Sequence, residues 1–282
     1  MQAGFCRLCG KDNRENTMTE KEYRAYPAIS RSALFRLAES PEKFKFYEEN
    51  PPAPTPALLF GQLFHKMALQ PETLWEEFIA APDIDRRTRR GKEKYAAFVE
   101  QSGEKTVVTW EDICKARAMC AALSASPFVG KLLSGEKEVP YFWQDDLTGE
   151  MCKCRVDCIS EIGGIALIVD LKSTANASTD AFIREAVKYG YDLQAAMYCE
   201  GVKRSTGKTH GFVFIAIEKE PPYAINILQA DKLFLRRGYD VFRELIGIYH
   251  ECKASGNWYG YLGRFDTINN LSLPAWLAKE VE

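Results

Sequence analysis

Two residues of the chain, an aspartate and a lysine, stand at a spacing that suits hydrolytic chemistry. Asp170 and Lys172 flank Leu171 in the mainly apolar segment IVDLKST, residues 168–174. If this segment is a strand, residues two apart point to one face, so the carboxylate and the ammonium project together while Leu171 turns into the core. Mg²⁺ usually takes one or two carboxylates from a protein and leaves positions for water or phosphate oxygens. A D-x-K pattern alone is weak, and a strand-end ion pair is the plainer alternative.

A second carboxylate precedes this pair by one predicted hairpin. Asp157 stands thirteen residues before Asp170, and the glycines Gly163 and Gly164 between them predict a turn. Antiparallel pairing across that turn would bring both carboxylates to one edge of the sheet. A metal ion between the two acids would have Lys172 beside it to orient, or help deprotonate, an attacking water.

A histidine on a predicted helix is the next candidate. After the proline-rich connector of residues 50–56, leucines and a methionine recur every fourth residue, which predicts a buried helix that carries Gly61 and His65 on one face. A lone histidine on such a helix is more often a hydrogen-bonded core residue than a metal ligand. Both interpretations remain open at this point.

A polar pair marks a later helix. Gln194 and Tyr198 lie one turn apart in a predicted helix over residues 179–204, and we expect this helix to pack beside the strand that carries Lys172. Glu138, just before another predicted strand, is a candidate outer-sphere acid. The alternative for Glu138 is an exposed position in a run of charges.

The order of apolar periodicities predicts an α/β fold with a central mixed β-sheet flanked by helices and preceded by an N-terminal helical region. The predicted strands cover residues 139–144, 152–160, 165–171, 211–217 and 223–228, and further helices cover 111–123 and 231–254. We expect a flexible leader over residues 1–18 and a single domain over 19–282. Within it, residues 19–135 are mainly helical, 136–254 form the catalytic core and 255–282 are a C-terminal tail.

Overall charge does not indicate a nucleic-acid-binding protein. The 282 residues include 37 Lys and Arg against 39 Asp and Glu, a net charge of −2, so any such surface must be local. One basic run stands out, with Arg86, Arg87, Arg89, Arg90 and Lys92 close together. This basic run predicts a surface that binds DNA phosphates or, with equal weight, a solvated loop without a binding role.

Length and composition exclude several other classes. No apolar run approaches the roughly 18 residues of a membrane span, and no signal peptide is visible, so we expect a cytoplasmic protein without membrane partners. Nine scattered cysteines favour reduced thiols over a disulfide framework. Cys6 and Cys9 form half of a zinc-ribbon pattern, but no second pair completes it, which leaves a zinc-dependent regulatory protein as a minor alternative.

The residues taken together resemble a known superfamily. The order His65, Asp157, Asp170-x-Lys172, Gln194-x-x-x-Tyr198 resembles the RecB-type branch of the PD-(D/E)xK nucleases. The segments ISRSAL and SPEKF, residues 29–34 and 40–44, resemble the C-terminal nuclease domain of RecE (exonuclease VIII) and its phage relatives. The similarity extends from about Thr19 to Ala254, in motif order.

The resemblance implies a restriction-endonuclease-like core and a set of site residues. His65, Asp157, Asp170 and the Leu171 carbonyl are implied as ligands of Mg²⁺ or Mn²⁺. Asp157, Asp170, Lys172, Gln194 and Tyr198 are implied as catalytic or supporting residues. Arg31 is a candidate for holding a terminal phosphate, by a weaker resemblance to lambda exonuclease. Related nucleases that hold an iron–sulfur cluster have three cysteines near the C-terminus, where this chain has only Cys252, so no such cluster is expected.

The same resemblance implies a phage or prophage exodeoxyribonuclease that resects linear double-stranded DNA, 5′ to 3′, for recombination. A ring-like homo-oligomer and a RecT-like single-strand annealing partner are implied as well. No Walker-type nucleotide-binding segment occurs, so we expect no use of ATP. The alternatives are an endonuclease or single-strand nuclease on the same core, and a DNA-binding module without catalysis.

Overall fold

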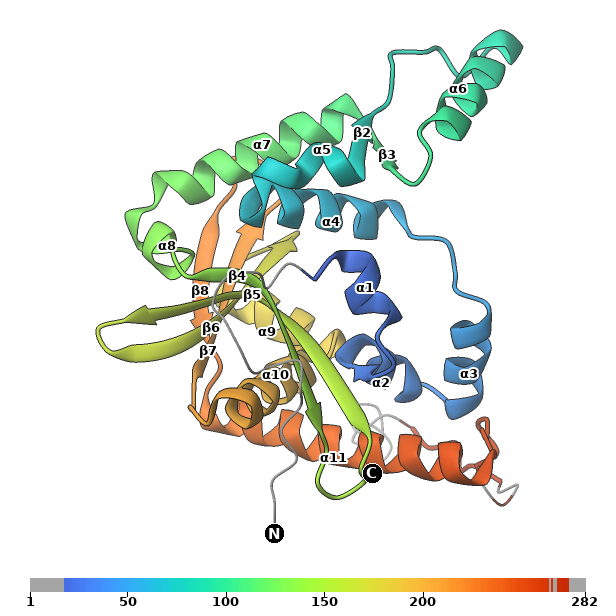
Figure 1. Cartoon of the computed structure of the whole chain (residues 1–282), viewed down its shortest axis with the longest axis vertical. Helices are drawn as coiled ribbons and strands as arrows, with labels where there is room; N and C mark the ends of the chain where they lie inside the picture. The colour runs from blue at the N-terminus through green and yellow to red at the C-terminus, as the bar shows by residue number, and fades with distance from the viewer. Residues whose placement is uncertain (1–17, 264, 266–267, 274–282) are drawn as a thin grey trace.

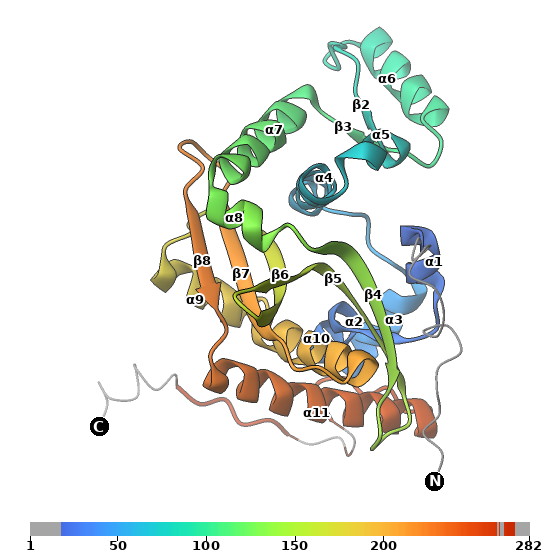
Figure 2. The same ribbon diagram turned by 60° about the vertical axis from the view of Figure 1, so that its left-hand side comes forward.

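A mixed six-stranded β-sheet forms the centre of the computed structural model, which describes residues 18–263, 265 and 268–273 (Figure 1). Its strands are β1 (Ile29–Ser30), β4 (Glu136–Gln144), β5 (Met151–Ile162), β6 (Ile165–Thr174), β7 (Gly211–Glu218) and β8 (Ile225–Gln229). Helices lie on both sides of the sheet, as Figure 2 shows, so the predicted fold class is confirmed. Cys6, Cys9 and most of the predicted leader lie outside the described residues.

The connections of the sheet place its two acidic strands side by side. The strand order is β1-β5-β6-β7-β8, and β4 pairs with β5. Strands β5 and β6 form the predicted antiparallel hairpin, whose turn contains Gly163 and Gly164 with φ of 60° and 80°. Strands β6 and β7 are parallel, and β8 returns antiparallel to β7. Asp157 and Asp170 therefore lie on neighbouring strands.

Strand β5 parts from β6 next to Asp157. Its pairing with β6 runs from Cys158 to Ile162, while its other end pairs with β1 through Cys152 and Lys153. On its opposite edge, β5 pairs with β4 along most of its length. Between these two partners, β1 and β6, residues 154–157 on this edge of β5 have no strand partner among the described residues, and Asp157 is one of them.

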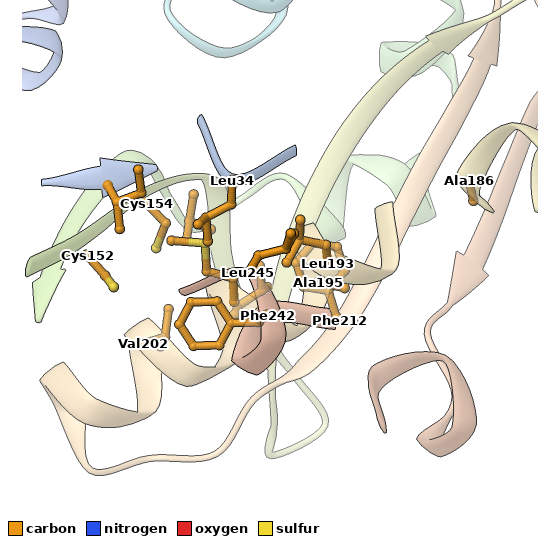
Figure 3. Packing of buried hydrophobic residues seen from close by; sticks show 14 of the residues in the cluster. Leu34, Cys152, Cys154, Ala186, Leu193, Ala195, Val202, Phe212, Phe242 and Leu245 are labelled. Atoms are coloured by element: carbon orange, nitrogen blue, oxygen red, sulfur yellow. The ribbon is translucent and has the colours of Figure 1, made fainter. Parts of the chain in front are cut away.

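Two hydrophobic cores cover the faces of the sheet because apolar residues alternate along β6 and β7. Ile168 and Phe212 belong to one core, and Val169 and Leu171 belong to the other. The first core packs against α2 (Arg31–Leu37), α9 (Thr179–Lys188), α10 (Tyr191–Thr206) and α11 (Lys232–Ser255). Figure 3 shows Phe242 of α11 beside Val202 of α10. The second core packs against α4 (Pro56–Leu69), α7 (Trp110–Ala125) and α8 (Pro127–Leu132).

The prediction of one helix over residues 179–204 is wrong. The chain breaks at Gly190 into α9 and α10, and Gly190 has the left-handed φ of 63°. A Cβ at this position would come within 2.7 Å of the Phe35 ring, and Arg31 donates a hydrogen bond to the Tyr189 carbonyl. The break therefore arises from contacts with α2, which the local amphipathic pattern does not contain.

A small arm projects from the helices on the α4 side. It contains α5 (Leu74–Glu77), β2 (Phe78–Ala80), α6 (Arg89–Gln101) and β3 (Thr106–Val108), and β2 and β3 pair in parallel. Figure 1 shows α6 at the outer end of this arm. Two further helices, α1 (Glu20–Ala25) and α3 (Pro41–Glu49), lie near the beginning of the described chain. Among the described helices, none has the length and apolar character needed to cross a membrane.

Candidate active site

Asp170 lies at the centre of a buried polar cluster. Its side chain is 1% exposed, and the Lys172 Nζ lies 2.5 Å from its Oδ1. Gln194, from the first turn of α10, donates its side-chain N–H to the other carboxylate oxygen. The two-residue strand period and the position of α10 thus bring three predicted residues together, while Leu171 is buried in the opposite core.

Asp157 is held where β5 leaves β6. Its Oδ2 accepts the backbone N–H of Leu171 at 2.8 Å, at the place where strand pairing has ended. His65, from α4, points its Nδ1 toward the same oxygen at 3.4 Å. Helix α4 begins at Pro56, directly after the N-cap residue Thr55, and its apolar face is buried. This packing fixes the position of His65 relative to β5.

Three carboxylates lie close together with little access to water. Burial raises the pKa of Asp170 above its ordinary value; the ammonium of Lys172 opposes this shift and the charge of Asp157 adds to it. Burial, with a contribution from Asp157, also raises the pKa of Glu138 to about 7, although Arg155 opposes it. The cluster thus concentrates negative charge in a poorly solvated place, which a bound cation would relieve.

The donor set suits a hard divalent cation. Asp157 and Asp170 supply carboxylate oxygens, His65 supplies an imidazole nitrogen, and the Leu171 carbonyl lies between Asp170 and Lys172 in the chain. Mg²⁺ and Mn²⁺ both prefer oxygen ligands, and of the two Mn²⁺ accepts an imidazole nitrogen more readily. In the described part of the chain, no three His, Cys, Asp or Glu side chains are already arranged around an ion position. In the structure, Lys172 contacts one carboxylate oxygen of Asp170 and Gln194 contacts the other. The residues fit the ion in chemical type, and the ligand set remains a prediction.

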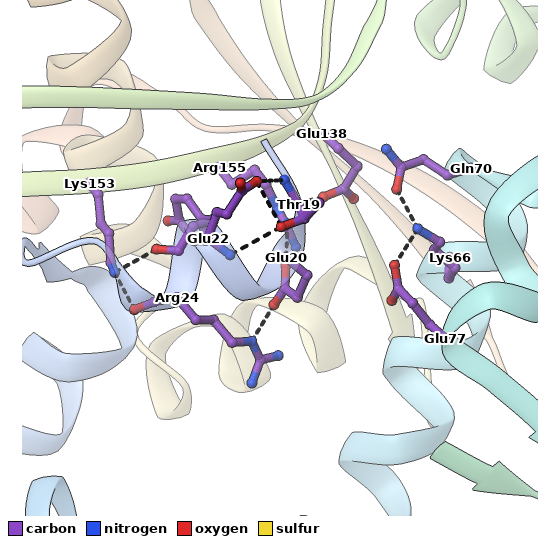
Figure 4. Close-up of polar contacts among 11 residues, drawn as sticks. Thr19, Glu20, Glu22, Arg24, Lys66, Gln70, Glu77, Glu138, Lys153 and Arg155 are labelled. Atoms are coloured by element: carbon purple, nitrogen blue, oxygen red, sulfur yellow. Dashed lines mark hydrogen bonds and ion pairs between the residues drawn. The ribbon is translucent and has the colours of Figure 1, made fainter. Parts of the chain in front are cut away.

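A charged chain of contacts connects the N-terminal helix to Glu138. Arg155 lies with its Nε 2.7 Å from Oε2 of Glu138 and also forms an ion pair with Glu20 of α1 (Figure 4). Its guanidinium lies over the Tyr23 ring, 5.1 Å from the centroid. Glu138 itself has φ of 55°, which is unusual for a residue with a side chain and marks a strained position. Sequence reasoning missed Arg155, although its place two residues from Asp157 on one strand was a signal.

Two tyrosines line the site. The Lys172 Nζ lies 4.9 Å from the ring centroid of Tyr191, a residue that the sequence analysis did not assign. Tyr198 is largely enclosed, and burial, together with neighbouring groups that include Asp170, raises the pKa of its hydroxyl well above its ordinary value. Both rings come from α10, so this helix supplies Gln194 and an aromatic wall.

Arg31 also lies near the site. Besides its bond to Tyr189, its guanidinium lies 5.0 Å from the Phe35 centroid and 5.9 Å from that of Tyr191. Burial lowers the pKa of Arg31, while the nearby charge of Asp170 opposes that shift. Its Nε is buried and, among the described residues, has no hydrogen-bond acceptor.

The predicted basic run lies elsewhere. Arg86, Arg87, Arg89, Arg90 and Lys92 are exposed residues in the loop before α6 and in its first turn. Figure 1 shows this part of the arm projecting away from β6 and α10. The structure therefore brings nine predicted residues together at the acids and leaves the basic run on the arm; the nine are Arg31, His65, Glu138, Asp157, Asp170, Leu171, Lys172, Gln194 and Tyr198.

Comparisons with known proteins agree with this architecture. A crystal structure of a candidate exonuclease from Eubacterium rectale is 20% identical in sequence, with a TM-score of 0.62, and the match covers 93% of this chain and 97% of that one. At that identity the likeness concerns the fold. A structure of SSO0001 matches with 12% identity over 79% of this chain and 77% of that one, with a TM-score of 0.37, which is too low to indicate a shared fold. No curated protein matches the chain.

The model of a PDDEXK-like domain of unknown function, DUF3799, matches residues 30–270. The chain belongs to this PDDEXK-like family, within the PD-(D/E)xK nuclease superfamily.

Proposed function

We propose that the chain is a metal-dependent deoxyribonuclease that degrades linear double-stranded DNA from its ends without ATP. The observation that carries this proposal is the meeting of Asp157, Asp170 and Lys172 on one hairpin, with Gln194 and His65 brought to them by two helices. A structural ion pair would need neither the second, partly buried acid nor the histidine.

Each side chain has a distinct part in this proposal. Asp157, Asp170, His65 and the Leu171 carbonyl would hold Mg²⁺ or Mn²⁺, and the bound ion would stabilise charge on the phosphate and activate water. Lys172 lies at hydrogen-bond distance from Asp170, where it can orient a water molecule and take part in its deprotonation. Gln194 holds the carboxylate of Asp170 in place, as the N–H of Leu171 does for Asp157.

The finer assignment rests on the motifs shared with the RecE nuclease domain. They support exonuclease action on duplex ends, 5′ to 3′, in recombination, by a homo-oligomer that works with a single-strand annealing protein. Arg31, beside Asp170, is proposed to hold a terminal phosphate. The basic residues of the arm are proposed to contact the DNA backbone, an interaction that weakens with salt.

Linear duplexes, covalently closed circular duplexes and single strands of one sequence, each incubated with Mg²⁺ or with Mn²⁺, test this proposal. We expect loss of the linear duplex and no loss of closed circles, and no loss of any substrate with the Lys172→Ala variant. The exposed Lys137→Ala is the matched control and should act like the wild type. Cutting of closed circles would establish an endonuclease instead, and digestion of single strands alone a single-strand nuclease. No cleavage with Mg²⁺ or Mn²⁺ would leave a DNA-binding module.

A further inference from the structure

A groove opens on the arm, away from the candidate active site. It measures about 330 Å³, and its walls include Pro82, Asp83, Arg86, Tyr95 and Trp110. Trp110, the first residue of α7, is 53% exposed. The Arg86 guanidinium already lies over the Tyr95 ring, 4.6 Å from its centroid. The groove therefore offers two flat π surfaces, the exposed indole of Trp110 at the start of α7 and the Arg86 guanidinium that lies over the half-buried Tyr95 ring on the arm.

The loop that forms the groove is held in place by its own contacts. Thr88 caps α6 by accepting the N–H of Gly91, and the Asp85 carboxylate accepts the N–H of Arg87 at 3.0 Å. A Cβ on Gly91 would come within 1.8 Å of the Asp85 carbonyl oxygen, so only glycine permits the loop to pack this closely. The aromatic and basic side chains are thus presented from a fixed backbone, which reduces the entropy lost on binding.

The charge around the groove favours a polyanion. Arg86 lines the groove, and Arg87, Arg89, Arg90 and Lys92 follow it in the same short segment, all of them exposed. Their charge alone would attract the phosphates of a duplex or of a single strand. Stacking distinguishes the two, because bases in a duplex hide their faces and unpaired bases offer them to aromatic side chains and guanidinium planes.

We infer that this groove binds unpaired bases of a DNA single strand, an inference that rests on the proposed function and names a second contact for its substrate. A base stacks on Trp110 or on the Arg86–Tyr95 pair while the exposed basic residues hold the adjacent phosphates. Asp83 can accept a hydrogen bond from a base N–H group, and its negative charge directs the phosphates to the basic side of the groove.

The test measures the binding of fluorescein-labelled oligothymidine and of a blunt duplex to the full chain by fluorescence anisotropy. EDTA is present so that DNA stays intact. Trp110→Ala and Tyr95→Leu are compared with Trp75→Ala, whose tryptophan is 44% exposed on α5 outside the groove. Thermal unfolding of each variant checks its fold. Because a stacked base contributes about tenfold in affinity, we expect Trp110→Ala to weaken oligothymidine binding about tenfold and duplex binding less than twofold.

Several results would overturn the inference. Equal losses for both DNAs would indicate a general phosphate surface, and an equal loss with Trp75→Ala would show that the groove is not special. Unchanged oligothymidine binding in folded Trp110→Ala and Tyr95→Leu would remove the stacking contact. Digestion of linear duplex by the same preparations with Mg²⁺ is measured separately, so that failure of the nuclease proposal is distinguishable from failure of this one.

Discussion

At the level of single residues, the candidate active site is defined by two carboxylates and one ammonium group that lie close together with little access to water. Asp157 and Asp170 are fixed by a backbone N–H and by Gln194, and Lys172 is the cation in contact with Asp170. Their nearness followed from sequence alone, because strand period and a two-glycine turn are local features. By contrast, the ion pair between Arg155 and Glu20 joins residues 135 positions apart, and no local sequence pattern predicts it.

Arg155→Lys tests whether the ion pairs of Arg155 with Glu20 and Glu138 help to position the acids that are proposed to bind the metal ion. Lysine keeps the positive charge but cannot contact Glu20 and Glu138 through separate nitrogens of one planar group. We expect the Mg²⁺ concentration that gives half-maximal cleavage to rise about tenfold, as for residues that orient metal ligands. Cleavage is followed over a Mg²⁺ titration, with the exposed Lys21→Ala as the control. An unchanged titration curve would show that Arg155 has no positioning role.

At the level of elements, the sheet and most helices were predictable because their apolar residues alternate or recur over long runs. Strands β1, β2 and β3 have only two or three residues and therefore carry no measurable period. The break between α9 and α10 was also missed. Its cause, the contact of Gly190 with Phe35, joins parts of the chain that the amphipathic pattern treats separately.

Gly190→Ala should therefore destabilise the protein. The new methyl group meets both an unfavourable φ and the Phe35 ring, and we expect a loss of about 2 to 4 kcal/mol in the free energy of unfolding. Gly207→Ala is the matched control, because Gly207 follows α10 with φ of 73° and has open space around it. That control should lose about 1 kcal/mol. Urea denaturation compares them, and equal losses would refute the steric account.

The β4–β5 hairpin is held on α11 by an ion pair that predicts a pH effect on stability. Burial alone would raise the pKa of Asp145, but hydrogen bonds from Arg243 and Thr148 outweigh it and lower this pKa to about 2. Because the pKa is lower in the folded state, the stabilisation is complete above about pH 4 and is lost as the pH falls toward 2.

Asp145→Asn should consequently be less stable than the wild type near pH 7, and the difference should narrow below pH 4. Chemical denaturation between pH 7 and pH 2.5 measures it. Asp146→Asn removes an exposed pair with Arg204 and should have a small effect throughout. A difference for Asp145→Asn that stays constant down to pH 2.5 would contradict the assignment of the low pKa.

At the scale of the whole molecule, the family match and the six-stranded core establish the superfamily, while the proposed chemistry requires a cation bound by the acids. A ligand that binds only the folded state raises the melting temperature. Saturating Mn²⁺ should raise the Tm of the wild type by about 3 °C or more. Asp170→Asn should show no rise, whereas Asp146→Asn should behave as the wild type. A rise in Asp170→Asn equal to that of the wild type would place the ion elsewhere.

In the proposed function, Asp170 and its neighbours cleave DNA with the help of a divalent cation. Single-turnover digestion of an end-labelled linear duplex, by wild type and Asp170→Asn with Mg²⁺ or EDTA, tests it most directly. We predict cleavage by the wild type with Mg²⁺, none in EDTA, and a rate at least about 10³-fold lower for Asp170→Asn. Cleavage by Asp170→Asn at the wild-type rate, or by the wild type in EDTA, would show that DNA is not cleaved by a metal-dependent reaction at Asp170.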